Sequence, residues 1–184
     1  MKQPTRGSFE GRRRTPIAVH AMLFAVMLLI SACKGSSSEP TPQPNAQPTS
    51  AVVKLSTVGT LPAGKKIGTI DVSLNLAPGV TLKTGTNPIE PDTAVVTASG
   101  AAAGSLLAAN YTAPTSTQPG RLRIAVISVS GFASGEFATV NGDIAAGNNP
   151  KASDFRLINF TATDNETPSS PLTGLTAGLS VDIL

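Results

Sequence analysis

Apolar and polar residues alternate along much of the chain after residue 50. The clearest example is residues 69–76, where Ile70, Val72, Leu74 and Leu76 are separated by polar residues. Successive side chains of a strand point to opposite sides of a sheet, so a strand with one buried side produces this pattern. The alternation therefore predicts a strand whose apolar side faces a core.

Residues 121–127 repeat this alternation, with Leu122, Ile124 and Val126 on one side. The free energy falls when large aliphatic side chains are removed from water. The apolar sides of these two predicted strands also match in length. We therefore predict that this strand and the one at 69–76 pack against each other across the core.

Seven further segments have strand character and are separated by loops rich in Gly, Pro, Asn or Asp. They are 51–57, 80–83, 93–98, 105–112, 136–144, 155–163 and 178–184. Only residues 98–109 tolerate a helix, but Gly100 and Gly104 oppose one, so we predict a loop that leads into a strand. Short strands without a helical pattern predict an all-β sandwich or barrel.

The N-terminal region has a different pattern, with ten apolar residues in a row at 21–30. This run is shorter than the about 20 residues that a membrane-spanning helix needs, and Arg12–Arg14 precede it. Both features are typical of a signal peptide. Residues 30–33, Ile-Ser-Ala-Cys, resemble the lipobox of bacterial lipoproteins. The resemblance implies a signal peptide at 1–32 and a lipid-bearing, acylated Cys33, rather than a core helix with a stray thiol.

A proline- and serine-rich segment follows Cys33 and extends over 33–50. It contains no bulky apolar residue, so it cannot bury enough surface to offset the entropy of ordering it. We predict a tether between the lipid and a folded domain at 51–184. Lys34, rather than Asp, follows the cysteine, which favours the outer membrane if the cell has two membranes.

Removal of the leader changes the charge of the protein. Residues 1–32 hold five of the 14 Lys and Arg residues but only one of the 11 Asp and Glu residues, so the remainder has a net charge of −1. No basic surface is left to indicate nucleic-acid binding.

The mature chain lacks the residues that most catalytic sites need. The single histidine, His20, lies in the leader, and Cys33 is the single cysteine. Ser–His–Asp or Cys–His catalysis and His/Cys metal sites are therefore excluded. We predict no enzyme activity, catalytic residue, cofactor or metal.

Carboxylates remain, but nothing in the sequence marks a catalytic pair among them. Calcium is the alternative metal, because Asp164-Asn165-Glu166 and the pair Glu90 and Asp92 offer oxygen ligands. Asp and Asn are also ordinary turn residues, and neither cluster has the spacing of a regular calcium loop.

Sugar-binding surfaces use exposed aromatic rings, and the mature chain has five aromatic residues. All five lie in or beside predicted strands, where core packing is expected, and Phe132 is the best candidate for partial exposure. They are Tyr111, Phe132, Phe137, Phe155 and Phe160.

Four segments of the predicted domain resemble the cohesin family. They are AVVKLST at 51–57, IGTIDVSLNLAPGVTL at 67–82, GRLRIAVISVSGFASGEFATVNGDI at 120–144 and ASDFRLINFTATD at 152–164. The resemblance implies a nine-stranded jelly-roll sandwich that binds a dockerin-like protein. Carbohydrate-binding modules share this sandwich, so a polysaccharide partner is the alternative.

In cohesins the third, fifth, sixth and eighth strands form the sheet that meets the partner. The corresponding strands here are 79–84, 105–112, 121–130 and 155–163. The resemblance thus implies a partner face formed by Thr81, Lys83, Asn110, Arg123, Ala125, Ile127, Arg156 and Asn159. The sequence therefore predicts a lipid-anchored interaction or assembly module of the cell envelope. A carbohydrate- or matrix-binding module, a spacer without a ligand and an enzyme are the alternatives.

Overall fold

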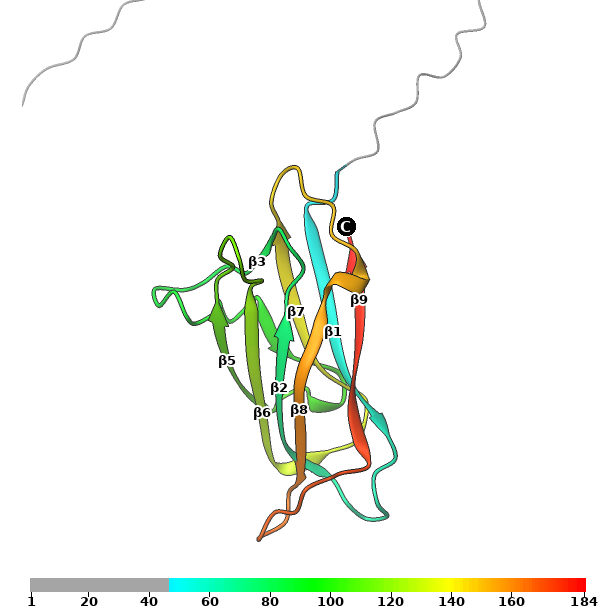
Figure 1. Ribbon diagram of the computed structural model, residues 1–184. Coiled ribbons are helices and arrows are strands. Elements are labelled where there is room, and N and C mark those ends of the chain that lie inside the picture. Colours follow the sequence, from blue (N-terminus) through cyan, green and yellow to red (C-terminus); the bar gives the residue numbers. More distant parts are fainter. Residues whose placement is uncertain (1–46) are drawn as a thin grey trace, which may run out of the picture. The chain divides into compact units, whose positions relative to one another are not determined.

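A computed structural model describes residues 47–184, which contain nine β-strands and two short 3-10 turns (Figure 1). The predicted signal peptide, Cys33 and most of the tether lie outside the described residues. No helix in the described part is long and apolar enough to cross a membrane. The strands are β1 (Ser50–Gly59), β2 (Ile67–Asn75), β3 (Val80–Thr81), β4 (Val96–Ala98), β5 (Leu106–Thr112), β6 (Arg121–Phe132), β7 (Glu136–Ile144), β8 (Arg156–Asp164) and β9 (Leu175–Ile183).

The strands form two antiparallel sheets. Sheet A has the order β3-β7-β1-β9, with β4 also paired to β7. Sheet B has the order β5-β6-β2-β8, and Figure 1 shows these four strands side by side. The predicted all-β sandwich is therefore confirmed.

The alternating residues form one apolar core between the sheets. Val53, Leu55 and Val140 of sheet A are buried, as are Ile70 and Val72 of sheet B. Burial of each such side chain contributes roughly 1.5–3 kcal/mol. The alternation in the sequence thus identifies correctly which side of each strand faces inward.

The predicted packing of residues 69–76 against residues 121–127 across the core is wrong. The two strands are neighbours in sheet B, and their apolar side chains lie side by side on the same inner surface. The paired residues are Ile70 with Val126, Val72 with Ile124 and Leu74 with Leu122. Matching alternation shows that two strands share a core but does not show whether they share a sheet.

The third predicted strand also belongs to a different sheet from the one expected. β3 pairs with β7 through Val80 with Ile144 and Thr81 with Asp143, so it lies in sheet A. The turn before it contains Gly79, whose φ of +78° favours glycine, and it carries the chain from sheet B to sheet A. β2 occupies the position in sheet B that the sequence assigned to 79–84.

The segment at 98–109 behaves as predicted. A single 3-10 turn at Gly100–Ala102 leads into β5. At the N-terminal end, β1 begins at Ser50 between β7 and β9. The backbone N–H of Thr49 donates to the carbonyl of Leu184 over 2.7 Å, so the chain enters the sandwich beside its C-terminal end.

Candidate interaction face

The outer side of sheet B, which we call the sheet-B face, is formed by four rows of side chains. Cross-strand neighbours project from the same side of an antiparallel sheet, so the register fixes these rows. They are Thr112, Arg121, Asn75 and Arg156; Asn110, Arg123, Ser73 and Asn159; Ala108, Ala125, Asp71 and Thr161; and Leu106, Ile127, Thr69 and Thr163.

Six of the eight residues predicted for the partner face lie in these rows: Asn110, Arg123, Ala125, Ile127, Arg156 and Asn159. Thr81 and Lys83 do not, because β3 lies in sheet A and Lys83 follows it in a loop. The sequence reasoning missed the polar residues of β2 in these rows, such as Asp71 and Asn75. Their alternation with buried residues showed that they point outward, but it did not place β2 in the middle of this sheet.

Every arginine of residues 47–184 lies on the sheet-B face: Arg121, Arg123 and Arg156. Arg123 is paired with Asp71 of the same face, with 2.6 Å between Nη2 and Oδ2. The hydrogen bond with this carboxylate raises the pKa of Arg123. Within the described residues, neither Arg121 nor Arg156 forms an ion pair, so one end of the face carries uncompensated positive charge.

The other end carries exposed aliphatic side chains. Leu106 and Ile127 face each other across β5 and β6 and are 75% and 46% exposed, and Val129, further along β6, is 92% exposed. Single exposed aliphatic residues are common, but a contiguous group marks a surface that tends to contact another molecule. We call Leu106, Ile127 and Val129 the apolar end.

A shallow hollow of about 210 Å³ lies between the two ends. The small side chains of Ala108 and Ala125 lie opposite each other there, whereas Asn110, Arg123 and Asp71 stand around them. Two alanines beside longer neighbours leave space above the sheet. The face thus has an apolar depression bordered by an ion pair and an amide.

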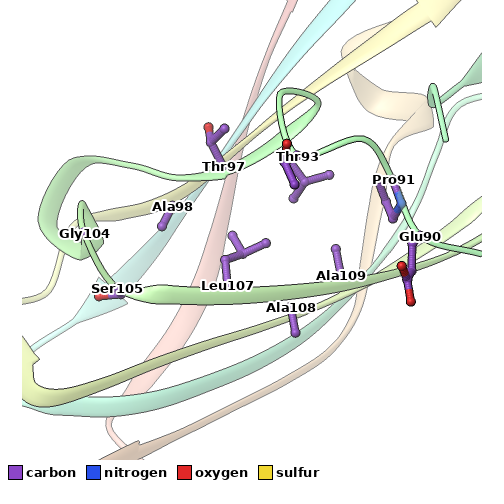
Figure 2. Close-up of a pocket in the computed structure, with 11 residues that line it drawn as sticks. Glu90, Pro91, Thr93, Thr97, Ala98, Gly104, Ser105, Leu107, Ala108 and Ala109 are labelled. Atoms are coloured by element: carbon purple, nitrogen blue, oxygen red, sulfur yellow. The ribbon is translucent and has the colours of Figure 1, made fainter. Parts of the chain in front are cut away.

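A second concavity, a groove of about 540 Å³, lies between the edge strands β4 and β5 (Figure 2). Figure 2 shows Leu107 and Ala109 on the side of β5 that faces the groove, and Ala108 on the opposite side. Glu90 is the only ionisable residue among those that line the groove. One carboxylate without a second acid or base does not form a catalytic pair.

The acidic cluster considered for calcium binds a lysine instead. Lys65 Nζ lies 2.9 Å from Asp164 Oδ2 and also contacts Glu166. Asp164 accepts the backbone N–H of Ser170 over 2.8 Å, and this bond, together with Lys65, lowers the pKa of Asp164. No group of three potential metal ligands occurs within residues 47–184.

The other proposed calcium ligands, Glu90 and Asp92, belong to a loop. Asp92 Oδ1 accepts the backbone N–H of Ala94 over 3.1 Å. This bond, from an Asp side chain to a backbone N–H two residues later, is typical of a turn.

Within residues 47–184, Ser99 and Glu136 are the hydroxyl and carboxylate in closest contact. Ser99 Oγ donates to Glu136 Oε1 over 2.6 Å, and Thr139 Oγ1 donates to the same oxygen over 3.2 Å. The bond from Ser99 is the main cause of the lowered pKa of Glu136. A carboxylate of lowered pKa is a weak proton acceptor, so this contact favours a structural role over activation of the serine.

The five aromatic rings of the described residues face the core. Tyr111, Phe132, Phe137 and Phe155 are at most 6% exposed, and Phe160 packs against the same core. The expectation that Phe132 is partly exposed is wrong, because β6 extends through Gly131 and Phe132 pairs with Ile67. The four rows of the sheet-B face therefore contain no ring on which a sugar could stack.

The described residues thus define an all-β sandwich of two antiparallel sheets with an arginine-bearing outer face on sheet B. Comparison with protein-family models, with curated proteins and with solved structures finds no match to this chain.

Proposed function

We propose that this chain is a non-enzymatic, lipid-anchored protein of the bacterial cell envelope that binds another protein through the sheet-B face. The observation that carries the proposal is the composition of that face. Arginines lie at one end of the face and exposed aliphatic residues at the other, with the alanine-floored hollow between them, and the four rows contain no aromatic ring. Protein interfaces combine an apolar centre with a polar rim and are enriched in Arg.

The buried rings favour a protein partner over a polysaccharide. Ring stacking needs an exposed aromatic platform, and the five aromatic residues of the described part are directed to the core. Leu106 and Ile127 lie on the exposed face instead. Their removal from water is more favourable in contact with apolar protein side chains than with hydroxyl-rich sugars.

We further propose that the sandwich is a cohesin-like jelly roll. Two features support this fold: β2 and β3 follow each other but lie in different sheets, and the sheet that bears the candidate face contains β5, β6 and β8. This sheet departs from the arrangement expected for cohesins in one respect: its fourth member is β2 rather than β3.

The lipid anchor supports a role at the membrane surface. The lipobox-like residues 30–33 imply attachment through Cys33, and the tether that follows would reach roughly 20 Å as a random coil. The sandwich would therefore stand clear of the lipid headgroups and be free to meet a partner.

The proposal can be tested by photo-crosslinking in the living cell. A photoreactive amino acid is placed at Ile127 on the sheet-B face or, as a control, at Lys54, an exposed residue of β1 in sheet A. We expect a discrete protein adduct from Ile127 and none of the same size from Lys54.

A second variant checks that the adduct reports binding. Ile127→Asp puts a charge at the apolar end, so it should weaken the affinity of the crosslinked partner at least about tenfold, or about 1.4 kcal/mol. Identical adducts from both positions, or an unchanged affinity in a variant that still folds, would remove the sheet-B face as the binding surface.

A further inference from the structure

The hollow on the sheet-B face has the properties of an anchor site. It lies beside the apolar end, its floor is formed by Ala108 and Ala125, and its volume is about 210 Å³. A cavity of about 150 Å³ is enough to hold a benzene molecule, so the hollow has space for one large apolar side chain. Interface hot spots are typically single large side chains that fill such depressions near the middle of a surface.

The charges around the hollow restrict what can accompany that side chain. Arg121 and Arg156 lie in the same row of the face and are separated by Asn75 of β2. Strands in a sheet are about 4.8 Å apart, so the backbones of the two arginines are roughly 10 Å apart. Arg123, at the wall of the hollow, adds a third guanidinium, and Asp71 is the only carboxylate in the four rows.

Two acidic residues lie near this region, and neither forms an ion pair with Arg121 or Arg156. Asp71 is paired with Arg123, and Asp154, in the depression next to Arg156, accepts the backbone N–H of Lys151 over 2.9 Å. The described residues as a whole have a net charge of −1, so the positive charge of this face is a local property of arginine placement.

We propose, on the basis of the proposed function, that the partner is an acidic protein segment. One large apolar side chain of that segment enters the hollow over Ala108 and Ala125, and neighbouring carboxylates bind Arg121 and Arg156. Guanidinium groups bind carboxylates through paired hydrogen bonds, so the arginines add orientation as well as attraction.

This proposal is tested by selection from a library of random peptides displayed on phage, with the full chain held in detergent micelles. We expect the selected peptides to carry several Asp or Glu residues beside one large apolar residue. Their affinity should fall as salt is added, since exposed charge pairs are screened. Polygalacturonate, an acidic polysaccharide, is measured in parallel.

Two kinds of variant distinguish the contribution of the hollow to binding from the contribution of the arginine charges. Ala125→Leu fills the hollow without changing the charge, and the double change Arg121→Glu and Arg156→Glu reverses the charge without filling it. Each should weaken the binding of the selected peptides at least tenfold. Ala108→Leu, from an exposed position, fills the hollow from the neighbouring strand and should act like Ala125→Leu.

Matched controls lie on the outer side of sheet A. Lys54→Glu reverses an exposed charge on β1, and Ser180→Leu places a leucine at an exposed position of β9. Both should leave the affinity within about twofold. All variants are checked for cooperative thermal unfolding before they are compared.

The outcomes distinguish this inference from the proposed function. Peptides that lack carboxylates but lose affinity with Ala125→Leu would overturn the acidic partner and leave the face as a protein-binding surface. Peptides sensitive to charge but not to Ala125→Leu or Ala108→Leu would overturn the hollow as the anchor site. Binding of polygalacturonate with no selected peptide, or peptides indifferent to every sheet-B variant, would overturn both proposals.

Discussion

At the scale of single residues, Asp164 shows how a buried charge is retained in this sandwich. It is 2% exposed, at the end of β8, and a buried carboxylate is costly unless it is paired and hydrogen-bonded. Lys65 supplies the opposite charge, and the backbone N–H of Ser170 donates a hydrogen bond over 2.8 Å. The residue therefore ties the loop after β8 to the loop before β2.

The lowered pKa of Asp164 predicts a specific acid sensitivity. A carboxylate with a folded pKa below its ordinary value of 3.8 stabilises the fold above that value, and this stabilisation is lost as the pH falls through the folded pKa. Asp164→Asn should therefore lower the urea midpoint at pH 7 and reduce the further decrease between pH 6 and pH 3. Equal pH dependence in the variant and the parent would contradict this.

The control for this prediction is Asp182→Asn, a change at an exposed aspartate of β9. It should leave the urea midpoint at pH 7 close to that of the parent. Some acid sensitivity should remain in Asp164→Asn, because the pKa of Glu136 is also lowered, mainly by Ser99.

Leu74 provides the corresponding prediction for the apolar core. It is fully buried on β2, so Leu74→Ala removes apolar contacts and leaves a cavity. The free energy of unfolding should decrease by about 2–5 kcal/mol in urea melts. Thr161→Ala, at an exposed position of the neighbouring β8, should cost well under 1 kcal/mol, and similar losses from both changes would show that the inward side is wrongly assigned.

At the scale of elements, β2 is held between β6 and β8, and both pairings shift register between Ile67 and Thr69. The residue at this irregularity is Gly68. A Cβ atom on Gly68 would lie 2.6 Å from both Asn165 Cα and the Asp164 carbonyl oxygen, which are backbone atoms that cannot simply rotate away. Glycine thus permits the close approach of two backbones at this bulge.

Gly68→Ala should therefore decrease the free energy of unfolding by about 1–3 kcal/mol, the range for forced overpacking. Gly85→Ala is the matched control, since a Cβ there meets no atom within 4 Å and the backbone is not in the left-handed region. That change should be neutral or stabilise the protein by up to about 1 kcal/mol. Chemical denaturation of both variants measures the difference, and equal effects would exclude the steric explanation.

At the scale of the whole molecule, the proposed function depends on attachment to a membrane through Cys33. Cys33→Ser removes the thiol that the lipobox resemblance assigns to the lipid. The variant should incorporate no fatty-acid analogue and should keep its leader, so it should migrate as the longer precursor. Metabolic labelling measures this, and label retained on the variant would refute attachment at this residue.

The sequence by itself determined most of the strands and their inward sides, because a period of two is a local property of the chain. The segments predicted at 105–112 and 136–144 match β5 and β7 within one residue. It also predicted that Asn110, Arg123 and Ile127 point outward, since each follows or precedes a buried residue. The lack of His after residue 20 likewise needed no structure.

The tertiary structure alone decided which strands are neighbours. Alternation is the same whether two strands lie in one sheet or in opposite sheets, so it could not place β2 beside β6 or move β3 to sheet A. The contacts that depend on this choice join residues far apart in sequence: Arg123 and Asp71 are 52 positions apart, and Lys65 and Asp164 are 99 apart. The hollow over Ala108 and Ala125 has the same origin, because it exists only when β5 and β6 pair in this register.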